Sequence, residues 1–123
     1  MKLKTYFRRI RQPMDGNCFY HSISFLFNYY NMNNITHEEI RKKVSDHYRK
    51  HGKRKRSKDI LRSGVWADTD DVIATSNAFK VSIKVWETKN NMWITFGDFK
   101  KKVYLYNFEM IHFDALLRCE QPS

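Results

Sequence analysis

The sequence predicts an α+β domain in which helices come first and a small, mostly antiparallel sheet follows. Apolar residues recur at helical spacing between residues 18 and 79, and beyond residue 80 they alternate with polar residues as in a half-buried strand. Short turn sequences separate the alternating segments. The chain has 123 residues, of which 41% are hydrophobic, so we expect residues 1–123 to form a single domain.

The start of the chain predicts a strand and then a helix. Residues 4–11 have the pattern of a short strand, which Pro13 and the turn after it would end. Residues 18–30 have helical periodicity, with Asp15 or Asn17 as the cap. The apolar stripe of this helix consists of Phe19, Ile23, Leu26 and Tyr30.

Two more helices are expected in the middle of the chain. Thr36 and Glu39 have the spacing of a capping box, which predicts a helix over 37–50. A short helix around 58–63 would end at Gly64. The inward residues expected for the helix over 37–50 are Ile40, Val44 and either His47 or Tyr48.

The second half of the chain predicts one further helix and then the sheet. Thr69 is expected to cap a helix that carries Asp70 and Asp71 in its first turn and ends near Phe79. After this helix the apolar residues recur with a period of two. The expected strands cover residues 81–86, 92–96, 103–106 and 111–116.

Charge and cysteine content limit the classes of partner. The formal net charge is +10, and much of it lies in the run Lys50–Lys58. That run is expected to be a solvated basic surface, a mobile loop or a nuclear-import signal. Two cysteines form no disulfide framework, and no apolar run reaches the length of a membrane span. We therefore expect a monomeric cytoplasmic protein without a membrane partner, with the nucleus as an alternative location through Lys53–Lys58.

The best candidate for chemistry is Cys18. It follows the tight turn Asp15-Gly16-Asn17 and takes the first position of a helix. Helix N-terminal amides and the helix dipole favour negative charge, which would lower the pKa of a thiol there. Cys18 therefore has the placement of a thiolate nucleophile, provided that another part of the chain supplies a base.

His112 and Asp114 are the strongest candidates for the base and for the group that orients it. Residues two apart on a strand share a face, so the Asp114 carboxylate can reach the imidazole nitrogen that points away from a thiol. An exposed polar strand face is the alternative explanation of this spacing. Among the other histidines, His21 is expected to be structural, whereas a surface position is expected for His37, His47 and His51.

Three segments resemble the motifs of the ovarian tumour (OTU) cysteine proteases, in that family's order. Residues 15–23, Asp-Gly-Asn-Cys-Phe-Tyr-His-Ser-Ile, are similar to the nucleophile motif, and Gly64–Asp68 with residues 74–85 resembles the central Trp segment. Residues 111–116, Ile-His-Phe-Asp-Ala-Leu, resemble the closing histidine motif. The first and last motifs are most similar to those of viral OTU domains of the nairovirus type.

The resemblance implies a papain-like OTU fold and a deubiquitinating cysteine protease that needs no cofactor or metal. Its substrate would be ubiquitin, polyubiquitin or another ubiquitin-like modifier. If the protein is viral, its activity would counteract ubiquitin signalling in the host. Cys18 would be the nucleophile, His112 the general base and then acid, and Asp114 the orienting acid. The oxyanion hole would lie in the turn of Asp15, Gly16 and Asn17. Substrate-binding positions would be Trp66, as a wall of the channel for the ubiquitin tail, and Asp68, as its lining.

Three alternatives remain open at the level of sequence. Cys18, His21, His112 and Cys119 could form a zinc module, although their spacing is unusual for one. The basic run and nearby tyrosines could make a nucleic-acid-binding module, as the main or a secondary function. An inactive OTU-like ubiquitin-binding protein is the third alternative. Cys119 is otherwise expected to be a buried or idle thiol.

Overall fold

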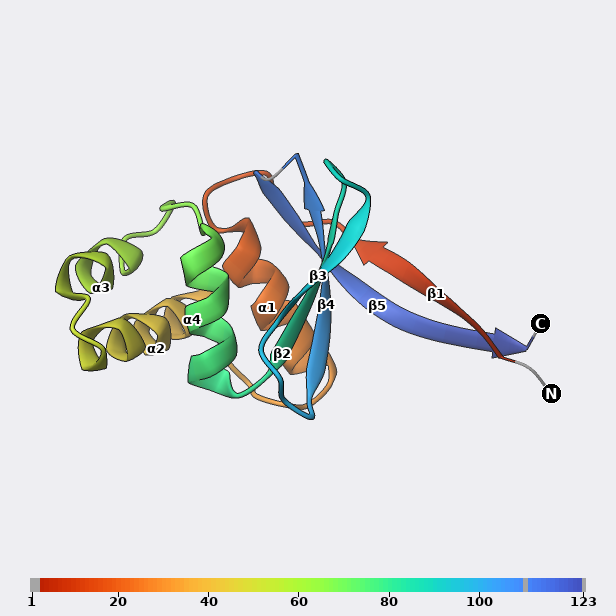
Figure 1. The fold of residues 1–123 in the computed structure, drawn as a ribbon, viewed down its shortest axis with the longest axis horizontal. Helices are drawn as coiled ribbons and strands as arrows, with labels where there is room; N and C mark the ends of the chain where they lie inside the picture. The colour runs from red at the N-terminus through yellow and green to blue at the C-terminus, as the bar shows by residue number, and fades with distance from the viewer. Residues whose placement is uncertain (1–2, 110, 123) are drawn as a thin grey trace.

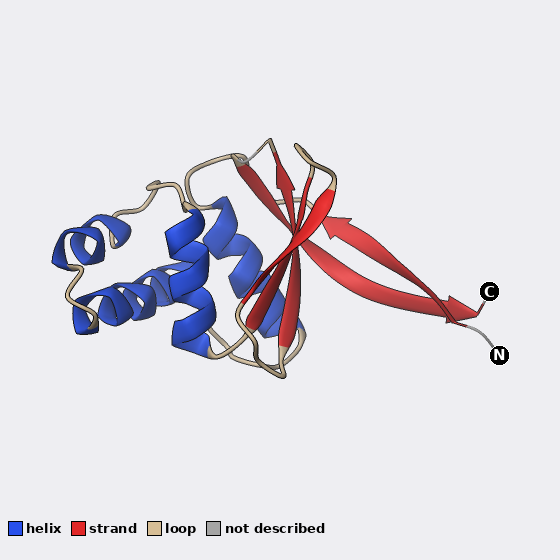
Figure 2. Ribbon diagram, viewed as in Figure 1, coloured by secondary structure: helices blue, strands red, loops and turns tan. Residues whose placement is uncertain are grey.

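The fold is a five-stranded sheet with its helices gathered on one face (Figure 2). A computed structural model describes residues 3–109 and 111–122. The predicted α+β class is confirmed. Its elements are β1 (Leu3–Ile10), α1 (Cys18–Tyr29), α2 (His37–Lys50), α3 (Arg54–Ile60), α4 (Thr69–Phe79), β2 (Ser82–Glu87), β3 (Met92–Phe96), β4 (Lys102–Phe108) and β5 (His112–Pro122).

The strands are ordered β1-β5-β4-β2-β3 across the sheet. Every neighbouring pair is antiparallel except β4 and β2, which are parallel. β1 and the distal part of β5 extend beyond the helices as a two-stranded ribbon, as Figure 1 shows. Because β1 pairs with β5, the segment before the Cys18 turn runs along the strand that begins with His112.

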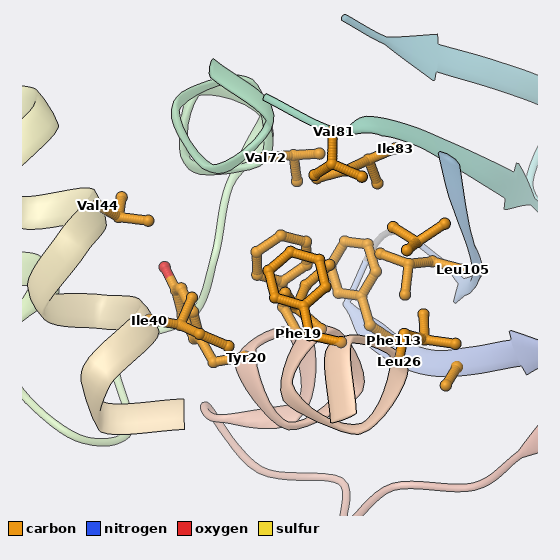
Figure 3. Close-up of a cluster of buried hydrophobic side chains, with 14 of the residues drawn as sticks. Phe19, Tyr20, Leu26, Ile40, Val44, Val72, Val81, Ile83, Leu105 and Phe113 are labelled. Atoms are coloured by element: carbon orange, nitrogen blue, oxygen red, sulfur yellow. The ribbon is translucent and has the colours of Figure 1, made fainter. Parts of the chain in front are cut away.

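The core lies between the sheet and the helices (Figure 3). Phe19 of α1 packs edge-to-face against Phe113 of β5, with ring centroids 5.2 Å apart. On β2 and β4 the inward positions alternate, as the period of two predicts, and Ile83 and Leu105 are completely buried. The start of α1 is therefore packed directly against the start of β5.

Several predicted boundaries need correction. The short helix covers Arg54–Ile60 instead of 58–63, so the mobile-loop expectation for the basic run is wrong. Ser57 is buried and exchanges hydrogen bonds with Ser45 of α2, which fixes this part of the run. The last strand continues to Pro122, well beyond residue 116, because β1 supplies a partner along its length. In the part of the chain that the structure describes, no helix is long and apolar enough to cross a membrane.

Helix caps were predicted with mixed success. The capping box of Thr36 and Glu39 is confirmed. Asp68, and not Thr69, caps α4, where it forms a reciprocal capping box with Asp71.

Asn17 occupies the N-cap position of α1 but makes no capping hydrogen bond, because its side chain is bound elsewhere. The inward face of α2 includes Tyr48 rather than His47.

A buried carboxylate joins three of the helices. Asp71 of α4 is completely buried and accepts a hydrogen bond from the hydroxyl of Tyr48 at 2.6 Å. Arg56 of α3 donates to both of its carboxylate oxygens. Burial alone would raise the pKa of Asp71, but the bonds from Arg56, Tyr48 and the Asp68 amide hold it below its usual value. Asp71 is thus a structural group that holds these three helices together.

We predict that Asp71→Asn destabilises the fold by about 3 kcal/mol at neutral pH, because it leaves the Arg56 guanidinium without its partner. A carboxylate with a depressed pKa stabilises the fold above its unfolded pKa of about 4 and loses this effect as pH falls through the folded value. The difference from wild type should therefore shrink at about pH 3. Urea unfolding followed by tryptophan fluorescence measures both values. The exposed neighbour Asp70→Asn is the control, and a pH-independent difference would contradict the assignment.

Candidate active site

Cys18 is the first residue of α1 and is 2% exposed. Its Sγ accepts a hydrogen bond from the backbone N–H of Phe113 at 3.3 Å. The hydroxyl of Ser22, one turn further along α1, contacts the carbonyls of both Cys18 and Phe113, at 2.8 and 3.3 Å. These contacts place the thiol beside the first residues of β5.

His112 and Asp114 lie on the same face of β5, as their spacing predicts. His112 Nε2 lies 2.8 Å from Asp114 Oδ1, and both side chains are buried. An ionised carboxylate can only accept, so Nε2 carries the proton in the neutral imidazole and Nδ1 is the free acceptor. Within residues 3–109 and 111–122, Nδ1 has no hydrogen-bond partner. The exposed polar face that the spacing also allowed is therefore wrong.

Asp114 is held ionised by the strand next to it. Its carboxylate accepts hydrogen bonds from the Gln12 backbone N–H at 2.6 Å and from Arg9 Nε at 2.7 Å. Burial alone would raise the pKa of Asp114, but the bonds from Gln12, Arg9 and His112 hold it below its usual value. Arg9 is itself placed over the Tyr106 ring, 4.0 Å from the centroid. The sequence reasoning missed Arg9 and Gln12, which become neighbours of Asp114 only through the pairing of β1 with β5.

The state of the thiol differs from the sequence expectation. Burial raises the pKa of Cys18, and the N–H groups of Phe113 and Phe19 oppose this effect only in part. The position at the helix N-terminus is therefore not enough to ionise the thiol. A base is needed to remove its proton, and the free Nδ1 of His112 is the group available on the adjacent strand.

The turn before Cys18 is tightly fixed. The Asp15 carboxylate accepts from the Asn17 N–H at 2.9 Å, and the Cys18 N–H donates to the Asp15 carbonyl at 3.2 Å. A Cβ on Gly16 would lie 1.7 Å from the Gly64 carbonyl oxygen, so only glycine fits here. In this conformation the Cys18 amide is used within the turn, so the peptide unit between Asn17 and Cys18 must reorient before that amide can donate to an oxyanion.

A second segment, residues 60–65, holds the turn from the other side. Asn17 Oδ1 accepts from the Gly64 N–H at 2.8 Å and from Arg41 Nη2 at 2.7 Å. Arg41 was not expected in the core, and it is 1% exposed. Its recurrence with Ser45 and Tyr48 at i, i+4 and i+7 is the signal that could have revealed a second buried face of α2.

The predicted substrate-binding residues lie on the segment that follows. Trp66 is 46% exposed between α3 and α4, and Asp68 caps α4 while also bordering a cavity of about 220 Å³. This cavity lies between the N-terminus of α4 and the inward face of the sheet, and it ends at Phe113. Other residues around it are Val72, Glu87, Ile94 and Asn107.

The zinc module is not formed. Cys119 lies six residues beyond Phe113 on β5, which at 3.3 Å per residue is ~20 Å along the strand. Among the described residues, no group of three or more histidine, cysteine, aspartate or glutamate side chains could hold a metal ion. The His21 ring contacts the tilted ring of His37, with centroids 4.1 Å apart, which fits the structural role expected for His21. Cys119 is a partly buried free thiol.

The chain is similar in sequence pattern and in fold to OTU-like cysteine proteases. Residues 13–113 match the family model of OTU-like cysteine proteases. A solved OTU domain in complex with ubiquitin is 16% identical and superposes with a TM-score of 0.78, over 94% of this chain and 72% of that one. A search of the curated proteins finds no match by sequence.

Two viral structures are also similar in fold. The Hazara virus OTU bound to ubiquitin is 24% identical, with a TM-score of 0.74 over 93% of this chain and 82% of that one. The OTU domain protease from Dera Ghazi Khan virus is 19% identical, with a TM-score of 0.76 over 94% and 86%. These likenesses confirm the fold that the sequence motifs implied.

We predict that His112→Ala leaves Cys18 a poor nucleophile at neutral pH. Because burial raises the thiol pKa, the variant should be alkylated by iodoacetamide slowly at pH 7, with a rate that still rises above about pH 9. Mass spectrometry of the Cys18 peptide gives the rates, with wild type as the reference. A plateau below about pH 8 in the variant would mean that the helix N-terminus alone ionises the thiol.

Proposed function

Because the chain belongs to the family of OTU-like cysteine proteases, we propose that it is a deubiquitinating enzyme. Its reaction is hydrolysis of the isopeptide or peptide bond after the C-terminal glycine of ubiquitin or a ubiquitin-like modifier. One observation carries the proposal: the Nε2 of His112 is bound to Asp114 while its Nδ1 is free, on the strand whose Phe113 amide contacts the Cys18 sulfur. Solved OTU domains of similar fold in complex with ubiquitin support the choice of substrate.

In the acylation step, His112 Nδ1 takes the proton of the Cys18 thiol as the sulfur attacks the carbonyl carbon of the terminal glycine. Asp114 stabilises the imidazolium that forms and holds the ring in orientation. The tetrahedral intermediate collapses when His112 returns the proton to the leaving amine, and a thioester on Cys18 remains. Water, deprotonated by His112, then attacks the thioester and releases the free ubiquitin carboxylate and the thiol.

The turn of Asp15, Gly16 and Asn17 supplies the oxyanion hole in this proposal. Because the Asn17 N–H donates to the Asp15 carboxylate, the N–H groups of Gly16 and Cys18 would face the oxygen that becomes negative, and each such donor is worth ~3–4 kcal/mol in the transition state. The Asp15 carboxylate, which binds the Asn17 N–H, keeps the turn in shape. Substrate binding is the step that would move the Cys18 amide from the Asp15 carbonyl to the oxyanion.

We place the tail of the modifier along the segment from Trp66 to Asp68. The exposed ring of Trp66 would form one wall of the channel, and the cavity beside Asp68 lies next to Phe113 and hence to the thiol. Asp68 would present the carboxylate oxygen that is not used for capping to a cation of the tail.

The setting of the reaction follows from the substrate. We propose that the enzyme acts on ubiquitin conjugates in the cytoplasm, or in the nucleus if the basic run is an import signal. In a viral product, the activity would counteract ubiquitin signalling in the host cell. A secondary nucleic-acid-binding role would use the exposed cations Lys53, Arg54, Lys55 and Lys58, since Arg56 is committed to Asp71.

The decisive experiment uses ubiquitin that carries an electrophile at its C-terminus. Folded protein should form a covalent adduct that is lost in Cys18→Ser and that mass spectrometry maps to Cys18. Cys119→Ser is the matched control, since it removes the other thiol without touching the site. Absence of a Cys18-dependent adduct, with ubiquitin and with probes of other ubiquitin-like modifiers, would refute the proposal.

We further predict that Asp114→Ala lowers kcat at least about a hundredfold, because the imidazole loses the group that fixes its tautomer. The control is Arg9→Gln, which removes another donor to the same carboxylate but leaves the contact with His112. Arg9→Gln should lower the thermal stability of the protein but change kcat much less than Asp114→Ala does. Hydrolysis of a fluorogenic ubiquitin amide gives kcat, and thermal unfolding gives stability. Equal kcat in Asp114→Ala and wild type would exclude the orienting role.

A further inference from the structure

Arg41 is a buried charge on α2 whose hydrogen bonds end at the candidate active site. Its guanidinium donates to four acceptors, at distances between 2.7 and 3.1 Å. Two of them, the Gly16 carbonyl and Asn17 Oδ1, belong to the turn before Cys18. The other two are the carbonyls of Ile60 and Val65, at the ends of the segment that faces this turn.

The guanidinium therefore bridges the turn of residues 15–17 to the segment of residues 60–65. The turn and the segment are also in direct contact with each other. The Gly16 backbone lies so close to Gly64 that no side chain fits between them, and Asn17 also binds Gly64 directly. The guanidinium carbon of Arg41 lies over the ring of Tyr20, 4.1 Å from its centroid, as in a cation–π contact. A lysine could not serve all four acceptors, since its ammonium is a compact group on a flexible stem.

The bond to the Gly16 carbonyl has a specific consequence for the turn. This carbonyl and the Asn17 N–H are the two ends of one planar peptide unit. Arg41 binds the carbonyl at 3.1 Å, and the Asp15 carboxylate binds the N–H at 2.9 Å from the other end. The peptide unit is thus held at both ends, and its plane sets the direction of the neighbouring amides.

We propose that Arg41 is a positioning residue of the active site, which holds the 15–17 turn against the 60–65 segment so that the backbone amides of the turn stabilise the oxyanion. The inference rests on the proposed hydrolytic function, in which this turn carries the oxyanion hole. Arg41 touches no reacting atom and acts only through Gly16 and Asn17. Its loss should lower the rate of acyl transfer more than the affinity for the substrate or the reactivity of the thiol.

The experiment compares Arg41→Lys and Arg41→Met with two controls on the same helix. Lys42→Met removes an exposed cation, and Val44→Ala loosens the packing of α2 without contact to the turn. For both Arg41 variants, kcat on a fluorogenic ubiquitin amide should fall about tenfold or more with little change in KM. Alkylation of Cys18 by iodoacetamide needs no oxyanion hole, so its rate should stay within about twofold of wild type. Arg41→Lys keeps the charge and most of the volume, which leaves a folded variant to measure.

Hydrogen–deuterium exchange tests the same inference without a substrate. In the Arg41 variants, exchange should rise in the peptides that cover residues 13–17 and 60–66, and it should stay near wild type in β4. Unchanged exchange in those two segments would overturn the proposal. A kcat loss in Val44→Ala as large as that in Arg41→Lys would also overturn it, since general loosening would then explain the effect. Wild type without activity on ubiquitin would refute the deubiquitinase proposal instead, and exchange would still decide the role of Arg41.

Discussion

The contact between the start of α1 and the start of β5 is the constraint on which the rest of the structure depends. Phe113 donates its N–H to the Cys18 sulfur, its ring packs on Phe19, and its carbonyl accepts from Ser22. Cys18 and His112, the proposed nucleophile and base, are 94 residues apart in sequence. The sheet and the core bring the thiol to the backbone of Phe113, the residue next to His112, and they bury both side chains.

Three buried charged residues connect the elements around the candidate site. Asp71 joins α2, α3 and α4, Asp114 joins β1 to the imidazole, and Arg41 joins the nucleophile turn to the segment before Trp66. Each makes several hydrogen bonds, which a buried charge needs to remain ionised. Such directional bonds hold loops in a single geometry, which apolar packing alone does not achieve.

Several local signals in the sequence predicted the structure correctly, although the cap of α4 is Asp68 and not Thr69. The capping box at Thr36 and Glu39, the alternation in β2 and the shared face of His112 and Asp114 depend on residues two or three positions apart. Predictions that needed distant partners were less accurate. The short helix was misplaced because Ser57 and Arg56 are fixed by α2 and α4, and β5 was too short because β1 extends it.

The sequence by itself determined the fold class, the family and the candidate residues Cys18, His112 and Asp114. Those features follow from periodicity and from motifs that each lie within one short segment. Only the tertiary structure revealed that Cys18 is buried, which raises the pKa of its thiol. It also decided that Arg9, Gln12 and Arg41 belong to the site. Their positions in sequence look like those of ordinary surface residues, and strand pairing and helix packing convert them into partners of Asp114 and of the turn.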